Sequence, residues 1–355
     1  MYENKRIKWG SVLKKISIIT VVLNGVSTID KTIRSVINQD YDNIEYIIID
    51  GGSTDGTIEI IEKYRDLIDI IISEQDSGLY NAMNKGIALA SGEIIGIINS
   101  DDWYEEGAIA EVVEAFEKKP EMEILFGNMN YIMTDGRIVK YEQPPFRSLW
   151  HLMSVNHPAT FVKREVYEKK GVFDEDFRIS GDFELMNRFW SYGSIFGHLN
   201  KTLSCFSLGG ISNSETELRD EENRYIREKY FDRELFVAGC LEDVVDKAFP
   251  IYLWGAGYGG RMLSGFLRDN NIVEGIIDVD SEKLGKRLNG IEIIRPDELP
   301  NCIVNIIISA YTRENEIREL IEKIYEDGHI VKSINDCYEA YEERLVLKNG
   351  ECLKF

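Results

Sequence analysis

Two adjacent acids at residues 101 and 102 lie shortly after an apolar run. The run IIGII (94–98) has the length of a buried strand, and NSDD (99–102) comes next. A buried carboxylate costs free energy unless a partner compensates its charge. One explanation is that Asp102 caps a helix over 105–118, with Glu105 as its capping-box partner. The other is that the two acids form part of a functional site.

A further acid, Asp50, ends the apolar run YIIID (46–50). The segment GGSTDGT (51–57) supplies glycines for a tight turn, and Ser, Thr and Asp side chains that can cap a helix beginning near Thr57. A capped turn accounts for the segment after Asp50, but it does not require Asp50 itself.

Strands and helices alternate over the first 120 residues. The pattern predicts strands at 16–23, 46–50, 68–73 and 93–98, and helices at 27–38, 57–64, 78–90 and 105–118. The segment 68–73 also fits an extension of the preceding helix. This alternation predicts an α/β fold with a mostly parallel sheet flanked by helices, which binds ligands beyond the carboxyl ends of its strands. Asn24, Asp50 and the pair at 101 and 102 would then converge on one edge of the sheet.

The second half of the chain is irregular at first and then returns to an α/β pattern. A hairpin is predicted around Asp135–Gly136. The predicted organisation is a basic tail at 1–14, a main domain at 15–213, a helical connector at 214–248, a smaller Rossmann-like α/β domain at 249–338 and a tail at 339–355.

Three segments together resemble the family 2 glycosyltransferases, which have the GT-A fold. They are ISIITVVLN (16–24), SVINQDYDNIEYIIIDGGSTDGT (35–57) and AMNKGIALASGEIIGIINSDD (82–102). The resemblance extends over about residues 14–215. It implies an enzyme that transfers a sugar, with inversion, from a nucleotide-sugar donor, most simply a UDP-sugar.

The resemblance also implies a nucleotide-sugar site. Asp50 matches an acid that contacts uracil, although the second acid of the usual pair is Gly51 here. Asp76 matches a position that lines the nucleotide pocket. Asn84 matches a family Asn at the nucleotide-sugar site, and Met83 stands where the family often has an Arg that helps to hold the diphosphate.

The acids at 101 and 102 match the metal motif of the family, whose first acid is Asn99 here. Mg²⁺ or Mn²⁺ needs only one or two protein carboxylates when diphosphate oxygens and waters complete its shell. We expect Asp102 to be the direct ligand, and Asp101 to contact the ribose or support the metal.

Asp182 matches the general base of the family, with Gly181 in place of the usual Glu. Such a base accepts the proton of the attacking acceptor hydroxyl. Glu184 is the second candidate for this role, and an N-cap is the structural alternative for Asp182. His157 matches a recurrent histidine that could contact the acceptor or phosphate, or serve only in packing.

The second α/β pattern carries GAGYGG (255–260) after a predicted strand. Gly255, Gly257 and Gly260 fit GxGxxG, and Asp278 ends the next strand, where a ribose-binding acid belongs. NAD or another nucleotide could bind there, or the domain could have a structural or oligomerising role. No catalytic Tyr–Lys or Cys–His set accompanies the motif, so we do not expect NAD chemistry.

The composition narrows the class of partner. A net charge of −21 argues against a nucleic-acid binder. The 5 cysteines form no CxxC pair, which favours a reducing cytoplasm. The basic segment 1–14 is either a solvated tail or a weak contact with the inner face of a membrane.

The sequence therefore predicts an inverting, metal-dependent glycosyltransferase that acts on a glycan or lipid-linked acceptor in surface polysaccharide biosynthesis. Two alternatives remain: an NAD(P)-dependent sugar-nucleotide oxidoreductase that uses the C-terminal domain, and a non-catalytic sugar-nucleotide-binding protein.

Overall fold

The computed structural model describes residues 14–141, 144, 146–150, 152–209, 215–267, 272–310, 313–325 and 328–349. The chain divides into two compact units. The first contains the described residues up to Tyr141 together with Val155–Tyr230, and the second contains those between 142 and 154 together with those from Phe231 onward. Residues 1–13 of the predicted basic tail lie outside the described part.

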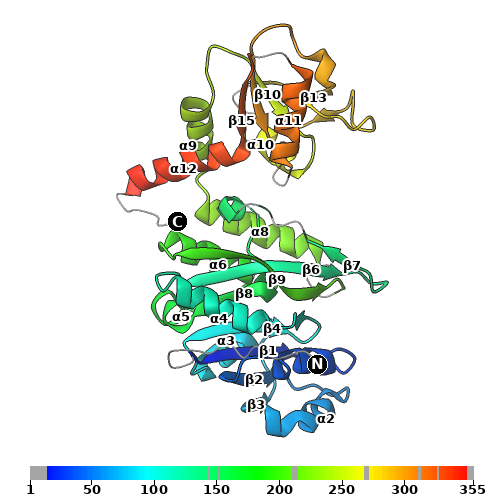
Figure 1. Ribbon diagram of the computed structural model, residues 1–355, viewed down its shortest axis with the longest axis vertical. Helices are drawn as coiled ribbons and strands as arrows, with labels where there is room; N and C mark the ends of the chain where they lie inside the picture. The colour runs from blue at the N-terminus through cyan, green and yellow to red at the C-terminus, as the bar shows by residue number, and fades with distance from the viewer. Residues whose placement is uncertain are drawn as a thin grey trace, which may run out of the picture. The chain divides into compact units, whose positions relative to one another are not determined.

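The first unit is built on one mixed sheet with strand order β3-β2-β1-β4-β8-β6-β9-β5, and β7 pairs with β6. Figure 1 shows β3, β2, β1, β4 and β8 side by side in this order. The strands are β1 (Ile16–Val22), β2 (Ile44–Asp50), β3 (Ile70–Ser73), β4 (Ile94–Asn99), β5 (Trp103–Tyr104), β6 (Ile124–Ile132), β7 (Ile138–Lys140), β8 (Thr160–Lys163) and β9 (Phe196–Ser207).

The strands β1 to β4 are parallel, β8 runs antiparallel to β4, and helices flank the sheet. The predicted α/β class is therefore confirmed. The helices are α1 (Ile29–Ile37), α2 (Thr57–Ile61), η1 (Glu62–Leu67), α3 (Leu79–Leu89), α4 (Ala108–Lys118), η3 (His157–Ala159), α5 (Arg164–Lys170), α6 (Gly181–Ser191) and α8 (Thr216–Tyr230).

Isoleucines form the centre of this sheet. β1 is buried along its whole length, and β2 and β4 are buried along most of theirs, as expected for parallel strands covered on both faces. The segment 68–73 contributes strand β3 rather than an extension of a helix. The predicted hairpin is also present, because β6 and β7 pair antiparallel on either side of Asp135–Gly136.

The second unit contains a smaller sheet with strand order β12-β13-β11-β10-β14-β15. Its five parallel strands, numbered along the chain, lie in the order 3-2-1-4-5, which also occurs in doubly wound folds. Its elements are η2 (Phe146–Trp150), α9 (Arg233–Gly239), η4 (Cys240–Val244), β10 (Ile251–Trp254), α10 (Tyr258–Leu267), β11 (Val273–Ile277), β12 (Arg287–Leu288), β13 (Ile291–Ile294), η6 (Pro296–Glu298), β14 (Asn305–Ile308), α11 (Glu314–Ile324), β15 (Ile330–Ser333) and α12 (Ile334–Asn349).

The short helix η2 belongs to the second unit, although the predicted boundaries place it in the main domain. Arg147 forms ion pairs with Glu339 at 2.9 Å and with Glu342 at 3.0 Å, both on α12. Trp150 meets the ring of Tyr341 edge-on at 5.7 Å. These contacts join residues far apart in the sequence, and periodicity does not reveal them.

Two other predicted boundaries also differ from the structure. The predicted connector 214–248 is divided, with α8 in the first unit and α9 in the second. The predicted tail at 339–355 is helical up to Asn349, because Tyr338 and Tyr341 are buried in α12. In the part of the chain that the structure describes, no helix is long and apolar enough to cross a bilayer.

Candidate active site

The ends of β1, β2 and β4 lie side by side. The strand register places Asp50 beside Val22 and Asn99 beside Val21. After β3 the chain returns to the opposite side of β1 with β4. Such a reversal of strand order opens a crevice for ligands beyond the carboxyl ends. The structure thus brings Asp50 and Asn99 to one edge of the sheet.

Asp102 is fully buried just beyond β4. Its Oδ1 accepts the N–H of Ser207, at the end of β9, at 2.9 Å. Its Oδ2 has no hydrogen-bond partner among the described residues. Burial raises the pKa of Asp102 well above its usual range, and the charge of Asp101 raises this pKa further. One oxygen of the carboxyl group is therefore held in place, while the other is buried without a partner among the described residues.

Asp102 does not cap the following helix, because α4 has Gly107 at its N-cap. The hydroxyl of Ser207 donates to the main-chain oxygen of Asp101 at 2.6 Å, so β9 fixes both acids. Burial also raises the pKa of Asp101. The capping explanation for these acids is wrong, and their arrangement fits a site.

The donor atoms at this edge suit a hard divalent cation. Oδ1 of Asn99 is a second buried oxygen without a partner among the described residues. Mg²⁺ and related cations prefer oxygen ligands and usually retain places for water and substrate phosphate. No cluster of three His, Cys, Asp or Glu side chains that could hold a metal occurs in the described ranges. Asn99 and Asp102 therefore fit a cation that is shared with a diphosphate.

Asp50 is fully buried, and its carboxylate is occupied by protein donors. Its Oδ2 accepts the N–H groups of Gly52 and Ser53, each at 3.1 Å, and the hydroxyl of Ser73 at 2.7 Å. These bonds fasten the loop after β2 to the end of β3. Oδ1 of Asp50 accepts the same N–H of Ser53 at 3.3 Å, so the carboxylate shapes the site, and its contact with a nucleotide stays a prediction.

Asp76 lies against the position of the missing second acid. A Cβ atom on Gly51 would lie 2.5 Å from Oδ2 of Asp76, and Oδ1 of Asp76 accepts the N–H of Gly78 at 3.0 Å. The carboxylate of Asp76 is partly exposed. It therefore occupies space that a side chain at Gly51 would otherwise require.

Asn84 uses its amide to hold a distant segment. Its Oδ1 accepts the N–H of Phe173, and its Nδ2 donates to the main-chain oxygen of Phe173, each at 3.0 Å. The same Nδ2 also lies 3.0 Å from Glu175. These contacts give Asn84 a structural role, and the nucleotide-sugar contact predicted for it stays a prediction.

Asp182 is the second residue of α6, two residues after the N-cap Ser180. The N-cap alternative for Asp182 is therefore wrong. Its Oδ1 accepts the N–H of Phe183 at 2.8 Å. Burial, with a smaller contribution from the charge of Glu222, raises the pKa of Asp182 to about 6. A carboxyl group with a pKa near neutrality is suited to general-base catalysis.

Tyr80 explains why residue 181 is glycine rather than the glutamate of the family pattern. A Cβ atom on Gly181 would lie 2.6 Å from the Tyr80 ring. The Tyr80 hydroxyl donates to the main-chain oxygen of Ile179 at 2.6 Å and accepts the N–H of Gly181 at 2.8 Å. A side chain at position 181 would displace this ring.

Glu184, the second candidate for the base, is occupied by other side chains. Its carboxylate is almost fully buried and lies 3.1 Å from Arg188 and 3.2 Å from Lys229. It also accepts the hydroxyl of Tyr230 at 2.5 Å. Glu184 thus joins α6 to α8 and is less suited than Asp182 to accept a substrate proton.

His157 is neutral at physiological pH, because burial lowers its pKa to about 4. Its ring meets Phe173 edge-on at 6.0 Å, and Phe173 stacks on Tyr80 at 5.2 Å. His157 is therefore connected through two aromatic rings to the turn that carries Asp182. A neutral imidazole there can exchange hydrogen bonds but carries no charge for phosphate.

In the second unit, the glycine motif lies between β10 and α10. Gly255 has φ +111°, and a Cβ atom on Gly260 would collide with the main-chain oxygen of Gly255. Asp278 accepts the N–H of Ala256 at 2.7 Å and pairs with Lys283 at 3.3 Å. The structure thus brings Asp278 to the loop of Gly255, Gly257 and Gly260, where its carboxylate holds the loop itself.

Sequence patterns did not indicate the roles of Tyr80, Ser207 or Glu222. Each makes its contact with the site across many residues, as in the pairing of Ser207 with Asp102. One feature of the sequence was a signal for the role of Tyr80: position 181 is glycine where the family usually has Glu, which leaves space for an aromatic ring.

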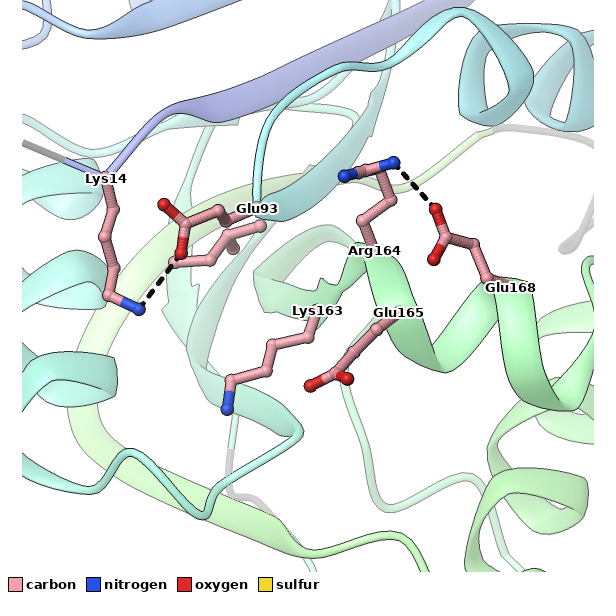
Figure 2. Close-up of a pocket in the computed structure, with 7 residues that line it drawn as sticks. Lys14, Glu93, Lys163, Arg164, Glu165 and Glu168 are labelled. Atoms are coloured by element: carbon pink, nitrogen blue, oxygen red, sulfur yellow. Dashed lines mark hydrogen bonds and ion pairs between the residues drawn. The ribbon is translucent and has the colours of Figure 1, made fainter.

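A cavity of about 310 Å³ lies at the opposite edge of the first sheet and contains none of the predicted site residues. Figure 2 shows two ion pairs among its charged side chains: Lys14 pairs with Glu93 at 3.3 Å and Arg164 with Glu168 at 2.7 Å. It is lined by Lys14, Glu93, Ile94, Lys163, Arg164, Glu165 and Glu168. The site described above therefore rests on the strand ends rather than on this cavity.

Comparisons with known proteins bear on the family and the fold of the chain. Residues 17–188 match the family model "Glycosyl transferase family 2". The chain is 32% identical over 179 residues to an uncharacterized glycosyltransferase of Mycobacterium tuberculosis, covering 49% of this chain and 68% of the relative. It is 25% identical over 207 residues to a PGL/p-HBAD biosynthesis glycosyltransferase of Mycobacterium bovis, covering 56% of this chain and 79% of the relative.

A crystal structure of Staphylococcus aureus TarS 1-349 in complex with UDP-GlcNAc resembles the chain in fold. The TM-score is 0.50 and the sequence identity 19%, with 71% of each chain covered. Residues 249–331 match a different family model, "C2185-like, N-terminal". That match does not describe nucleotide binding, so a nucleotide at the glycine motif stays a prediction.

Proposed function

Because the chain belongs to glycosyltransferase family 2, we propose that it transfers a sugar from a UDP-sugar to a glycan or lipid-linked acceptor, with inversion at the anomeric carbon. One observation carries this proposal: Oδ2 of Asp102 is buried at the carboxyl-end edge of the sheet and has no partner among the described residues. The UDP-GlcNAc complex of the similar TarS supports the choice of uridine.

In the proposed reaction, Asp182 accepts the proton of the acceptor hydroxyl as that oxygen bonds to the anomeric carbon. The bond from this carbon to the diphosphate breaks, and UDP leaves. Asp102 and Asn99 would hold Mg²⁺ or Mn²⁺, with Asp101 close to the ribose. When bound, the cation supplies positive charge that stabilises the leaving diphosphate.

The proposal also includes a biosynthetic role, a cellular location and a role for the second unit. We assign the enzyme to surface polysaccharide biosynthesis at the cytoplasmic face of a membrane, with the basic segment 1–14 as a peripheral contact. The second unit would serve as a structural or oligomerising domain, or hold a nucleotide at Gly257. The oxidoreductase and non-catalytic alternatives are not favoured, because the relatives described above are glycosyltransferases.

A donor assay tests this function without requiring the acceptor. We expect the full chain to release nucleoside diphosphate slowly from one UDP-sugar in Mn²⁺, and to lose this activity in EDTA. A panel of UDP-, GDP- and dTDP-sugars would be screened by diphosphate release. Activity with a GDP-sugar alone would support the transferase activity and contradict the proposal that the donor nucleotide is UDP. Release that is insensitive to EDTA would overturn the role of the metal.

The nucleobase contact can be tested at Asp76. We expect Asp76→Ala to weaken UDP binding about 10- to 100-fold, the effect of losing a charge-assisted hydrogen bond. Gly51→Asp alone would place its Cβ against Asp76 and weaken binding as well. In the double variant the new acid would have space, and UDP affinity should be partly restored, as measured by calorimetry.

Asp66→Asn is the matched control for Asp76→Ala, because Asp66 is an exposed acid on η1. Its UDP affinity should equal that of the wild type. Unchanged binding in Asp76→Ala would assign the nucleobase contact to another residue and leave the rest of the proposed mechanism intact.

A further inference from the structure

The turn that carries Asp182 is held from helix α8 by a single carboxylate. Glu222 accepts the N–H groups of three consecutive residues: Arg178 at 2.7 Å, Ile179 at 3.0 Å and Ser180 at 2.7 Å. Consecutive N–H groups that converge on one point form a favourable environment for an anion. The carboxylate of Glu222 provides that anion from within the chain.

Tyr80 holds the same turn from helix α3. Its hydroxyl binds the main-chain oxygen of Ile179 and the N–H of Gly181, and its ring lies against Gly181. Both polar main-chain groups of Ile179 are therefore bonded, one to Glu222 and one to Tyr80. The backbone immediately before Asp182 is fixed from two helices.

Helix α8 lies outside residues 17–188, the range that matches the family model. It is nevertheless anchored in the first unit, because Ile226 is fully buried and Tyr225 packs on Phe177 with ring centroids 6.1 Å apart. Lys229 adds an ion pair with Glu184 of α6. The support of the catalytic turn thus comes from an element that the matched range does not include.

We propose that Glu222 is a positioning residue for the transfer: its carboxylate fixes the turn before α6, and its negative charge helps Asp182 to act as a proton acceptor at neutral pH. The proposal rests on the role of Asp182 proposed above. The charged side chain that shifts the pKa of Asp182 is Glu222 from α8, while burial, with a smaller contribution from the charge of Asp182, raises the pKa of the Tyr80 hydroxyl from α3. Removal of the charge of Glu222 would lower the pKa of Asp182, because a nearby anion disfavours the ionised carboxyl group.

Glu222→Gln and Glu222→Asp separate the charge from the reach of the side chain. In Glu222→Gln the length is kept but the charge and at least one acceptor site are lost. We expect the acidic limb of the pH–rate profile to move below about 6, and kcat to fall by about tenfold or more through misplacement of Asp182. In Glu222→Asp the charge is kept but the reach is shorter, so kcat should fall with less movement of the limb.

Hydrogen exchange gives a readout that does not depend on turnover. We expect the amides of residues 178–180 to exchange about tenfold faster in Glu222→Gln than in the wild type, because their acceptor is weakened. Glu221→Gln is the matched control, since Glu221 is exposed on the same helix. It should leave both exchange and the pH profile unchanged, and thermal unfolding would confirm that each variant is folded.

The outcomes distinguish this inference from the proposed function. An active wild type whose pH limb and exchange are unaffected by Glu222→Gln would overturn the inference and leave the function standing. A wild type without turnover on any donor would overturn the function, and the exchange data would still decide whether Glu222 fixes the turn. Equal effects of Glu221→Gln and Glu222→Gln would also overturn the inference.

Discussion

Replacing Asp182 by Asn is expected to lower turnover about 10²- to 10⁴-fold, the usual contribution of a general base. An amide of nearly the same shape cannot accept the proton of the acceptor hydroxyl. UDP affinity should remain within about threefold of the wild type, because a base on the acceptor side makes no contact with the nucleotide. Initial rates of UDP release and calorimetry would separate these two effects.

The wild-type rate should also depend on pH through this residue. Only the ionised carboxylate of Asp182 can accept a proton, and the pKa of Asp182 is raised to about 6. The rate should therefore fall as the pH drops below about 6, rather than near the ordinary value of an aspartate. This limb should be absent from the residual activity of Asp182→Asn.

Asp176→Asn is the control, because Asp176 is an exposed acid in the segment that leads to α6. It should retain the wild-type rate and pH profile. If Asp182→Asn kept full turnover, the base would have to be another group. If it lost UDP binding instead, Asp182 would belong to the donor side of the site.

The strand ends could be located from the sequence because apolar runs and turn residues are local signals. The run that ends at Asn99 and the acids at 101 and 102 lie where that pattern places them. The direction in which an individual side chain points does not follow from these local signals. Asp50 was correctly placed at the end of β2, but its carboxylate turns to the N–H groups of Gly52 and Ser53.

Contacts across long sequence separations explain the residues that were missed. Tyr80 meets Gly181 and Asn84 meets Phe173 in the fold alone. The two partners on α3 are four residues apart, so they share one face of the helix and clamp the same segment. No pattern within α3 distinguishes such a face from an ordinary packing face.

The assignment of η2 to the second unit has a similar cause. Its buried Trp150 and its ion pairs from Arg147 are completed by α12, nearly two hundred residues further along the chain. The sequence indicates that Trp150 requires a partner, but not where that partner lies. Boundaries drawn from composition therefore placed this segment in the main domain.

Asp102→Asn is expected to abolish metal-dependent donor binding while it stabilises the fold. Oδ1 of an Asn side chain can still accept the N–H of Ser207, so the local geometry should be kept. The charge that attracts the cation would be lost, and we expect UDP affinity in Mn²⁺ to fall by about 100-fold or more, at a cost of about 2.8 kcal/mol. Glu106→Gln, which alters an exposed acid nearby, should have no effect on UDP binding.

The gain in stability follows from the cost of a buried carboxylate without a cation. Burial raises the pKa of Asp102, so the folded state binds this proton more tightly than the unfolded state does. The contribution of Asp102 to stability is therefore greatest in acid and decreases as the pH rises. In EDTA at pH 8, Asp102→Asn should be more stable than the wild type by about 1–3 kcal/mol, and this advantage should shrink at pH 4.

Mn²⁺ with UDP should raise the Tm of the wild type alone, because a ligand stabilises only the state that binds it. A loss of stability in Asp102→Asn under all these conditions would instead give Asp102 a structural role. The opposite changes in stability and binding are expected because a ligand-binding residue is selected for the bound state, at the expense of the free protein.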